Sequence, residues 1–296
     1  MSKKISVVGI GEALWDMLPE GKKLGGAPAN FAYHVAQFGI PSQAISAVGN
    51  DQLGQSIIEQ LDLRHMHHLI ETVPYPTGTV HVTLDHRGVP CYRIKEGTAW
   101  DNIPFTSRIE EAAKACTAVC FGSLAQRSSV SRQTIYRFLE SMPNDDDHLR
   151  IFDINLRQDY YSKEVIDESF SRCNILKIND EELSIVAHLF GLCASNQREQ
   201  SMNLLHRYSL RMVILTCGAE GSYVFTPSQV SYFDTPKVRV ADTVGAGDSF
   251  TAAFAASLLR GRSLQQSHEL AVKVSAYVCT QNGAMPTLPK HLRLMG

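Results

Sequence analysis

Short apolar runs alternate with helical patterns along most of the chain. The run at 5–11 (ISVVGIG) is continuous and ends in glycines, which is typical of a buried parallel strand. Further strand-like runs occur at 118–123, 151–155, 175–179 and 212–218. Helical patterns fill the gaps between them, for example at 128–141 and 180–190. This alternation predicts an α/β fold, with a mostly parallel sheet covered by helices on both faces.

One region departs from the alternation. Residues 79–84 (TVHVTL) alternate polar and apolar positions, 85–88 (DHRG) offer a turn, and a second strand pattern follows at 89–94. Residues 15–18 supply another strand nearby. The pattern predicts a small antiparallel sheet, built from about 12–22 and 75–100 and inserted in one domain that spans 1–296. Two interpretations stay open: a lid or dimer surface, and an edge hairpin without functional motion.

A glycine-rich segment precedes the first predicted helix, which Gly26-Ala27-Pro28 opens and Gly39 closes. The bland interpretation is that its two glycines only make a tight turn. Asn30, one turn into the helix, and Asp16, from the preceding segment, supply donors and an acceptor suited to sugar hydroxyls.

The stretch RVADTVGAGDSFTAAFAASLL at 239–259 carries the clearest chemistry. Residues 249–259 form an apolar helical pattern, which places Gly245 and Gly247 in the first turn, where N–H groups have no intrahelical partner. Glycine lets a ligand approach that backbone closely, and the positive helix end favours phosphate. Asp248 would repel phosphate, so its better role is to accept a proton from a hydroxyl that attacks the phosphorus.

Composition narrows the class of protein. The 296 residues are 44% hydrophobic and 20% charged with a net charge of −2, which favours neither a nucleic-acid nor a membrane partner. The seven cysteines include no C-x-x-C pair, which argues against a disulfide framework and a zinc ribbon. The N-terminal apolar run is too short for a signal peptide, and no apolar stretch has membrane-spanning length. A cytoplasmic protein is expected.

Other motifs are weaker. The Gly9-x-Gly11 pair follows a strand, but Leu14 replaces the third glycine of a dinucleotide fingerprint, which makes a nicotinamide oxidoreductase a poor alternative. No P-loop motif is present. The histidines at 65, 67 and 68 lie on a polar stretch without a matching ligand set, so a solvated surface is preferred to a metal site.

Together, GGAPANFAYHVAQFG and DTVGAGDSF resemble the two signatures of the ribokinase-like (pfkB-type) carbohydrate kinases. The landmarks DINLR, KINDEE and TCGAEGS agree in order, and the likeness covers essentially the whole chain. Within the family, GEALWDMLPEG followed by GGAPAN looks most like the fructokinases. The resemblance implies a ribokinase-like Rossmann-type three-layer fold with a small β lid, and phosphoryl transfer from MgATP to a sugar hydroxyl.

The resemblance also implies site residues. In the catalytic set, Asp248 matches the base, Gly245, Ala246 and Gly247 match the anion hole, and Arg157 lies in a segment that often meets phosphate or sugar. The implied sugar contacts are Asp16, Gly25, Gly26, Asn30 and, from the lid strand, Arg93. The implied nucleotide contacts are Asn179, Thr216, Gly218, Ala219, Gly221 and Gly247. Asn179 and Glu182 match the Asn-x-x-Glu motif that orders Mg²⁺ mostly through water, although Asn179 also suits a helix cap.

Many relatives are activated by a monovalent cation beside the anion hole. The possible K⁺ site here consists of Asp242, Val244, Val278, Gln281, Gly283 and Thr287. One departure bears on adenine contacts, because relatives often carry Asn or His near position 272, where this chain has Val272.

The leading hypothesis is an ATP-dependent kinase that phosphorylates fructose at its 6-hydroxyl. Kinases for ribose, 2-keto-3-deoxygluconate or a nucleoside remain alternatives, because the candidate sugar contacts do not separate these substrates. A sugar-binding sensor without catalysis is a further alternative. A homodimer through the small sheet is also possible, because its edges and apolar face need cover.

Overall fold

The computed structural model describes residues 5–18, 21–84, 90–192, 194 and 196–293. A nine-stranded sheet forms its centre, in the order β13-β12-β11-β10-β9-β8-β1-β4-β5. Its strands are β1 (Val7–Ile10), β4 (Ser42–Gly49), β5 (His67–Val73), β8 (Ala118–Phe121), β9 (Leu149–Asp153), β10 (Ile175–Asn179), β11 (Met212–Thr216), β12 (Ser222–Phe225) and β13 (Val230–Phe233). All neighbouring pairs are parallel except β11–β12 and β12–β13, which confirms the predicted mostly parallel sheet.

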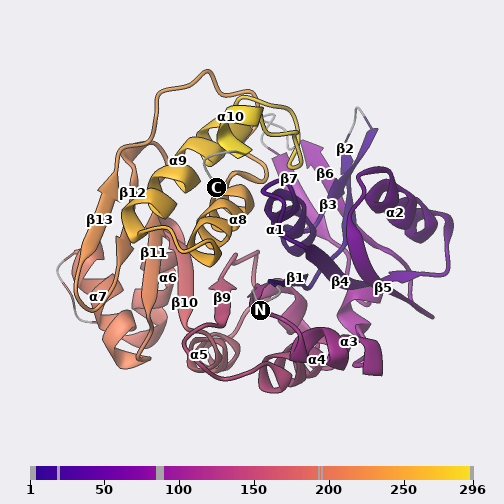
Figure 1. Ribbon diagram of the computed structural model, residues 1–296. Coiled ribbons are helices and arrows are strands. Elements are labelled where there is room, and N and C mark those ends of the chain that lie inside the picture. Colours follow the sequence, from indigo (N-terminus) through magenta and orange to yellow (C-terminus); the bar gives the residue numbers. More distant parts are fainter. Residues whose placement is uncertain (1–4, 19–20, 85–89, 193, 195, 294–296) are drawn as a thin grey trace.

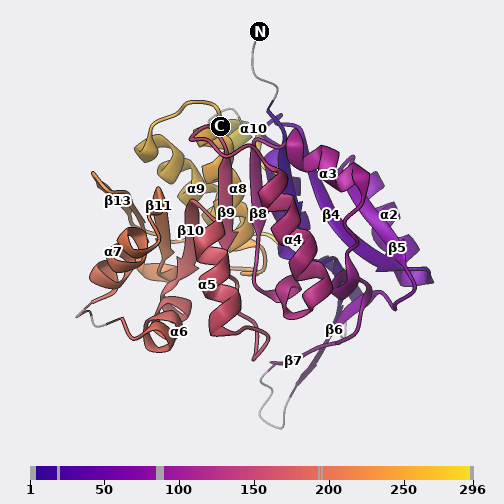
Figure 2. The ribbon, with the colours of Figure 1, turned by 90° about the horizontal axis from the view of Figure 1, so that it is seen from below.

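Helices cover both faces of this sheet (Figures 1 and 2). One layer consists of α3 (Ser107–Lys114), α4 (Ser129–Ser141), α5 (Lys163–Arg172), α6 (Asp180–Phe190) and α7 (Gln197–Arg207). The other consists of α1 (Ala27–Ala36), α2 (Gln52–Leu63), α8 (Ala246–Leu259), α9 (Leu264–Cys279) and α10 (Lys290–Arg293). Three short 3₁₀ turns complete the chain: η1 (Ala99–Asn102), η2 (Leu124–Arg127) and η3 (Gly218–Glu220).

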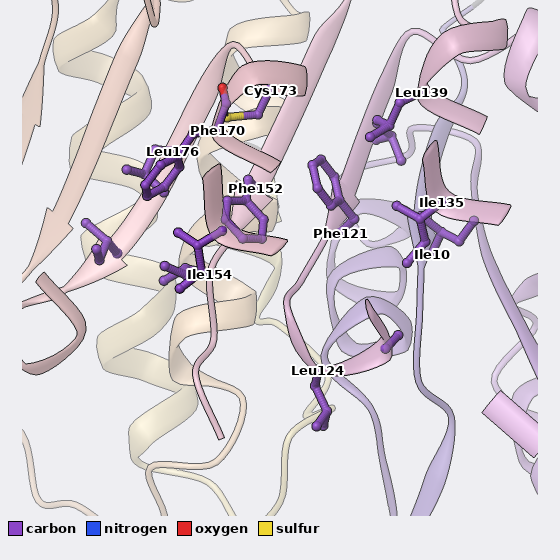
Figure 3. Close-up of a cluster of buried hydrophobic side chains, with 14 of the residues drawn as sticks. Ile10, Phe121, Leu124, Ile135, Leu139, Phe152, Ile154, Phe170, Cys173 and Leu176 are labelled. Atoms are coloured by element: carbon purple, nitrogen blue, oxygen red, sulfur yellow. The ribbon is translucent and has the colours of Figure 1, made fainter. Parts of the chain in front are cut away.

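The two helical layers have separate apolar cores because successive strand residues point to opposite faces. Val8 and Leu176 face the α3–α7 layer, whereas Val7 and Ile175 face α8 and α9. The first core centres on aromatic rings, which Figure 3 shows packed between strands and helices. Those of Phe121 and Phe152 stack with centroids 5.1 Å apart. The second core includes four alanines of α8, and these small side chains let α8 and α9 pack closely on the sheet.

A second, four-stranded sheet projects from the edge of the domain, in the order β3-β2-β6-β7. It contains β2 (Leu14–Leu18), β3 (Gly21–Gly25), β6 (Gly78–Leu84) and β7 (Pro90–Ile94). This confirms the small sheet, and the hairpin pair β6–β7 is antiparallel as predicted. The central pair β2–β6 instead runs parallel, because α1, β4, α2 and β5 intervene between these two strands. The predicted turn at 85–88 lies outside the described residues.

The candidate residues gather where parallel strands end. The candidates Asn179 and Thr216 are the last residues of β10 and β11, Asp153 is the last residue of β9, and the carboxyl ends of these strands meet at one edge of the sheet. Ligands of open α/β sheets bind at that edge. Within the described ranges, no helix is long and apolar enough to cross a membrane.

Candidate active site

The first turn of α8 lies at the centre of the site. Gly245 caps the helix with φ 78°, and a Cβ there would lie 2.7 Å from Ala284, so the close packing as well as the backbone angle requires glycine. Ala246 donates its N–H to the Thr243 carbonyl at 3.2 Å. Gly247 and Asp248 follow at helical positions whose N–H groups have no intrahelical acceptor, so these two amides are available to an anion.

Asp248 is held by a residue from the other end of the chain. Its Oδ2 accepts a hydrogen bond from Asn30 Nδ2 at 2.8 Å, across 218 positions of sequence. Burial and the nearby Asp153 carboxylate raise the pKa of Asp248 to about 7, against the opposing effects of Asn30, Lys177 and Arg157. A carboxylate with this proton affinity is a stronger base than an ordinary aspartate and suits proton transfer near neutral pH.

The predicted sugar residues surround Asn30. Gly26 caps α1 with φ 123°, and a Cβ there would lie 2.3 Å from the Glu12 carbonyl oxygen. Gly25 leaves room for Asp16, whose Oδ2 would otherwise lie 2.5 Å from a Cβ. Burial raises the pKa of Asp16 to about 6, although Arg157 and Lys23 oppose this rise. Steric contacts therefore favour glycine at both Gly25 and Gly26, in addition to any requirement of a tight turn.

Arg157 contributes positive charge near Asp16 and Asp248. Its side chain is exposed on the segment after β9, and it lowers the pKa values of Asp16, Glu12 and Asp248. An exposed cation that interacts with both Asp16 and Asp248 can meet an anionic group bound between them. Arg93 lies exposed on β7, opposite His81, and its contact with a sugar stays a prediction.

Asn179 and Glu182 form a capping box at the start of α6. Asn179 Oδ1 accepts from the Glu182 N–H at 2.7 Å, and Glu182 Oε2 accepts from the Asn179 N–H at 2.9 Å. Glu182 Oε1 also accepts from the Leu156 N–H at 3.0 Å. Burial raises the pKa of Glu182 despite Lys177 and these N–H donors. Each of these oxygens keeps one further lone pair and could accept a hydrogen bond from metal-bound water, but magnesium binding by this pair stays a prediction.

The predicted nucleotide turn lies beside this motif. Thr216 on β11 is the register partner of Asn179 on β10, so the two sets adjoin at the sheet edge. The turn continues through η3, which includes Ala219. Gly218 and Gly221 adopt φ values of 52° and 121°, and a Cβ at Gly221 would lie 2.6 Å from the Phe233 carbonyl oxygen. Val272 is buried among the apolar residues of α8 and α9.

Asp242 joins the two loops proposed to hold a monovalent cation. Its Oδ1 accepts from the Val244 N–H and its Oδ2 from the Gly283 N–H, both at 3.0 Å. Val278 lies near the end of α9, and its carbonyl accepts from the Gln281 N–H at 2.9 Å. The carbonyl of Thr287 accepts from the Tyr277 hydroxyl at 3.1 Å. Cation binding by these six residues stays a prediction.

Sequence reasoning gave no role to Asp153, Lys177 and Thr251, which lie directly behind the first turn of α8. Lys177 Nζ is 3.0 Å from Asp153 Oδ1, and Thr251 Oγ1 donates to Asp153 Oδ2 at 3.0 Å. A signal was available, because a lysine inside the apolar strand ILKIN is rarely buried without a partner.

This chain is similar to known proteins over nearly its whole length. The model of the pfkB family carbohydrate kinases matches residues 20–291. A fructokinase from Salmonella typhimurium is 30% identical, covering 98% of this chain and 97% of that protein. An ATP-dependent 6-phosphofructokinase from Thermoanaerobacterium thermosaccharolyticum is 28% identical, covering 97% and 92%. The structure of a fructokinase double mutant from Vibrio cholerae O395, bound to fructose, ADP and potassium, aligns with a TM-score of 0.81 at 23% identity, covering 99% and 98%.

Proposed function

The chain belongs to the pfkB family of carbohydrate kinases, and from that premise we propose that it transfers the γ-phosphoryl group of ATP to the 6-hydroxyl of fructose. The phosphotransferase class, with an alcohol group as acceptor, follows from the family. The sugar, the attacked hydroxyl and the roles of individual residues are the proposal.

The observation that carries the proposal is the hydrogen bond between Asn30 and Asp248. It joins the sugar segment at the start of α1 to the first turn of α8. A sugar held by Asp16 and Asn30 therefore presents a hydroxyl beside the Asp248 carboxylate. Asp248 accepts the proton of that hydroxyl as the oxygen attacks phosphorus, so the nucleophile is activated where the phosphoryl group arrives.

The helix end supports the other half of the reaction. The amides of Gly247 and Asp248, with the positive end of α8, lie where the negative charge of the transferring group is stabilised. Thr216, Gly218, Ala219 and Gly221 would hold the nucleotide at the adjoining sheet edge. When bound, a magnesium ion neutralises charge on the phosphates. Asn179 and Glu182 would orient its water molecules.

Fructose is preferred among sugars because fructokinases recur among the relatives and one related structure is described with fructose and ADP bound. The potassium ion in that structure likewise supports a K⁺ requirement through the loops that Asp242 joins. A second candidate substrate is fructose 6-phosphate, favoured by the 6-phosphofructokinase relative and by the exposed Arg157 beside Asp16. The two substrates differ in whether the acceptor carries a phosphate.

The test is ADP formation from MgATP with fructose, fructose 6-phosphate, ribose, 2-keto-3-deoxygluconate and adenosine, each with and without K⁺. The expected result is a preference for fructose and faster turnover with K⁺. Asp248→Asn should lower kcat by about 10³-fold while fructose still binds, because the general base is lost and the shape is kept. Preference for another acceptor would refute the assignment of fructose, and near-normal turnover of Asp248→Asn would refute the assigned base.

Two features of the wider molecule belong to the same proposal. The small sheet is proposed as a lid within a single kinase domain and as the face of a homodimer. A cytoplasmic location is proposed because Cys116, Cys120, Cys173 and Cys217 are buried as free thiols, as in proteins of reducing compartments.

A further inference from the structure

Lys177 and Asp153 form an ion pair behind the anion-binding turn. They are register partners on β10 and β9, and the distance from Nζ to Oδ1 is 3.0 Å. The exposed fractions of the two side chains are 9% and 7%. Because alternate residues of a strand face the same side, Lys177 and Asp153 point with Ile175 and Ile151 toward the α8 layer. The pair is thus enclosed between the sheet and the helix that carries Asp248.

The ammonium group occupies the space that a side chain at Gly247 would fill. A Cβ at Gly247 would lie 2.9 Å from Lys177 Nζ and 3.7 Å from Cε. Asp153 reaches the next turn of the same helix by accepting from Thr251 Oγ1 at 3.0 Å. The pair therefore supports α8 at two successive turns, beneath the amides that face the transferring group.

Asp153 also borders the base itself. Asp153, Asp248 and Cys120 line a small cavity of about 10 Å³ between β8, β9 and α8. The Asp153 carboxylate raises the pKa of Asp248, and the Lys177 ammonium lowers it. Movement of either charge would alter both the position of the turn and the proton affinity of the base.

The charge of Lys177 indicates a role other than packing. Lys177 is buried, and the carboxylates of Asp153, Glu182 and Asp248 all interact with its charge. A cation beneath a helix N-terminus opposes the helix dipole. Well-packed apolar residues usually stabilise a core at least as well as a buried ion pair. Stability by itself therefore gives little reason for a charge at this place.

We propose that Lys177 and Asp153 are positioning residues for phosphoryl transfer, which hold the Gly247 amide and the Asp248 carboxylate in their reactive arrangement. The inference rests on the kinase function proposed above. Neither side chain contacts the sugar in this account. Their loss should thus lower kcat and leave the binding of the two substrates nearly unchanged.

The experiment compares the wild-type chain with Lys177→Met/Asp153→Asn, which removes the two charges of the pair together. Thr251→Val removes the hydroxyl that links Asp153 to α8 and that also lies 3.1 Å from the Gly247 carbonyl oxygen. Lys114→Met is the matched control, because Lys114 forms an exposed pair with Glu110 on α3, in the opposite helical layer. Steady-state kinetics with fructose and MgATP, calorimetric binding of fructose and of ATP, and thermal unfolding are measured for each.

The expected result is a fall in kcat of about 10- to 100-fold for the double variant, since small displacements of a reactive group cost this much. The kcat of Thr251→Val should also fall, but by a smaller factor, and the kcat of Lys114→Met should equal that of the wild type. Both substrate affinities should stay within about threefold, as expected when positioning rather than binding is lost. The inference is overturned if kcat of the double variant stays within about twofold, or if kcat, both affinities and thermal stability fall together. A wild-type chain that phosphorylates no sugar of the panel would instead overturn the proposed function, and this inference with it.

Discussion

Replacing Asp248 by asparagine should stabilise the fold at neutral pH while it lowers kcat by about 10³-fold. The carboxylate is enclosed between α1 and the sheet, and burial beside Asp153 raises its pKa to about 7 from an ordinary value of 3.8. Above pH 7 the charged form is therefore less favourable in the folded chain than in the unfolded one. Asparagine removes this charge, and its amide oxygen can still accept the hydrogen bond from Asn30.

The size and sign of this change in the free energy of unfolding follow from proton linkage. A shift from 3.8 to about 7 corresponds to about 4 kcal/mol at 1.36 kcal/mol per unit, and partial exposure of the side chain reduces this toward about 2 kcal/mol. Because the folded pKa is raised, the protonated form favours folding below pH 4. That contribution is lost as the pH rises through 7. The stabilisation by Asp248→Asn should thus be largest at pH 8 and shrink steadily between pH 7 and 5.

Urea unfolding of the wild type and Asp248→Asn at pH 5, 6, 7 and 8 measures this difference directly. The comparison at pH 5 serves as the internal control, because most of the difference should have disappeared there. If the variant is less stable at pH 8, or if the difference does not change with pH, then the carboxylate is not destabilised in the way described.

The remaining predictions concern the sugar site and the helix cap. Asp16→Asn should raise KM for fructose by about tenfold or more, because a charged hydrogen-bond acceptor is lost. KM for ATP should stay within about twofold of the wild-type value. Equal changes in the two KM values would contradict the place of Asp16 in the sugar site. Gly245→Ala should lower the free energy of unfolding by about 2–4 kcal/mol in urea, because both φ 78° and the 2.7 Å approach to Ala284 oppose a Cβ. Gly97→Ala, at φ 64° with open space around it, is the matched control and should lose only about 1 kcal/mol; equal losses would refute the packing argument.

Local patterns predicted those elements whose signals lie within a few residues. β10 and α6 have the predicted bounds, because Asn179 ends an apolar strand and caps the following helix. β4 (SQAISAVG) and β5 escaped prediction, since small and polar residues interrupt their apolar pattern. Their pairing depends on contacts distant in sequence.

The features of the candidate site likewise divide into those that local sequence predicts and those that depend on distant contacts. The glycines before Asp248 predict a helix end that suits an anion, so the proposed base and its amides could be chosen from the sequence. The Asn30–Asp248 hydrogen bond and the Lys177–Asp153 pair could not, since they depend on α1 lying against α8 and on the register of β9 and β10. Sequence identifies the residue types, and topology decides which of them meet.

The 218 positions between Asn30 and Asp248 have a consequence for synthesis on the ribosome. α8 and α9, which cover one face of the sheet, leave the exit tunnel after all nine of its strands. Until then the strands already made can pair, but their apolar residues Val7, Ile151, Ile175 and Ile214 lack their cover. Nascent chains at that stage expose a surface prone to aggregation. Release of these two helices both covers the core and brings Asp248 to Asn30, so a nascent chain without them has neither.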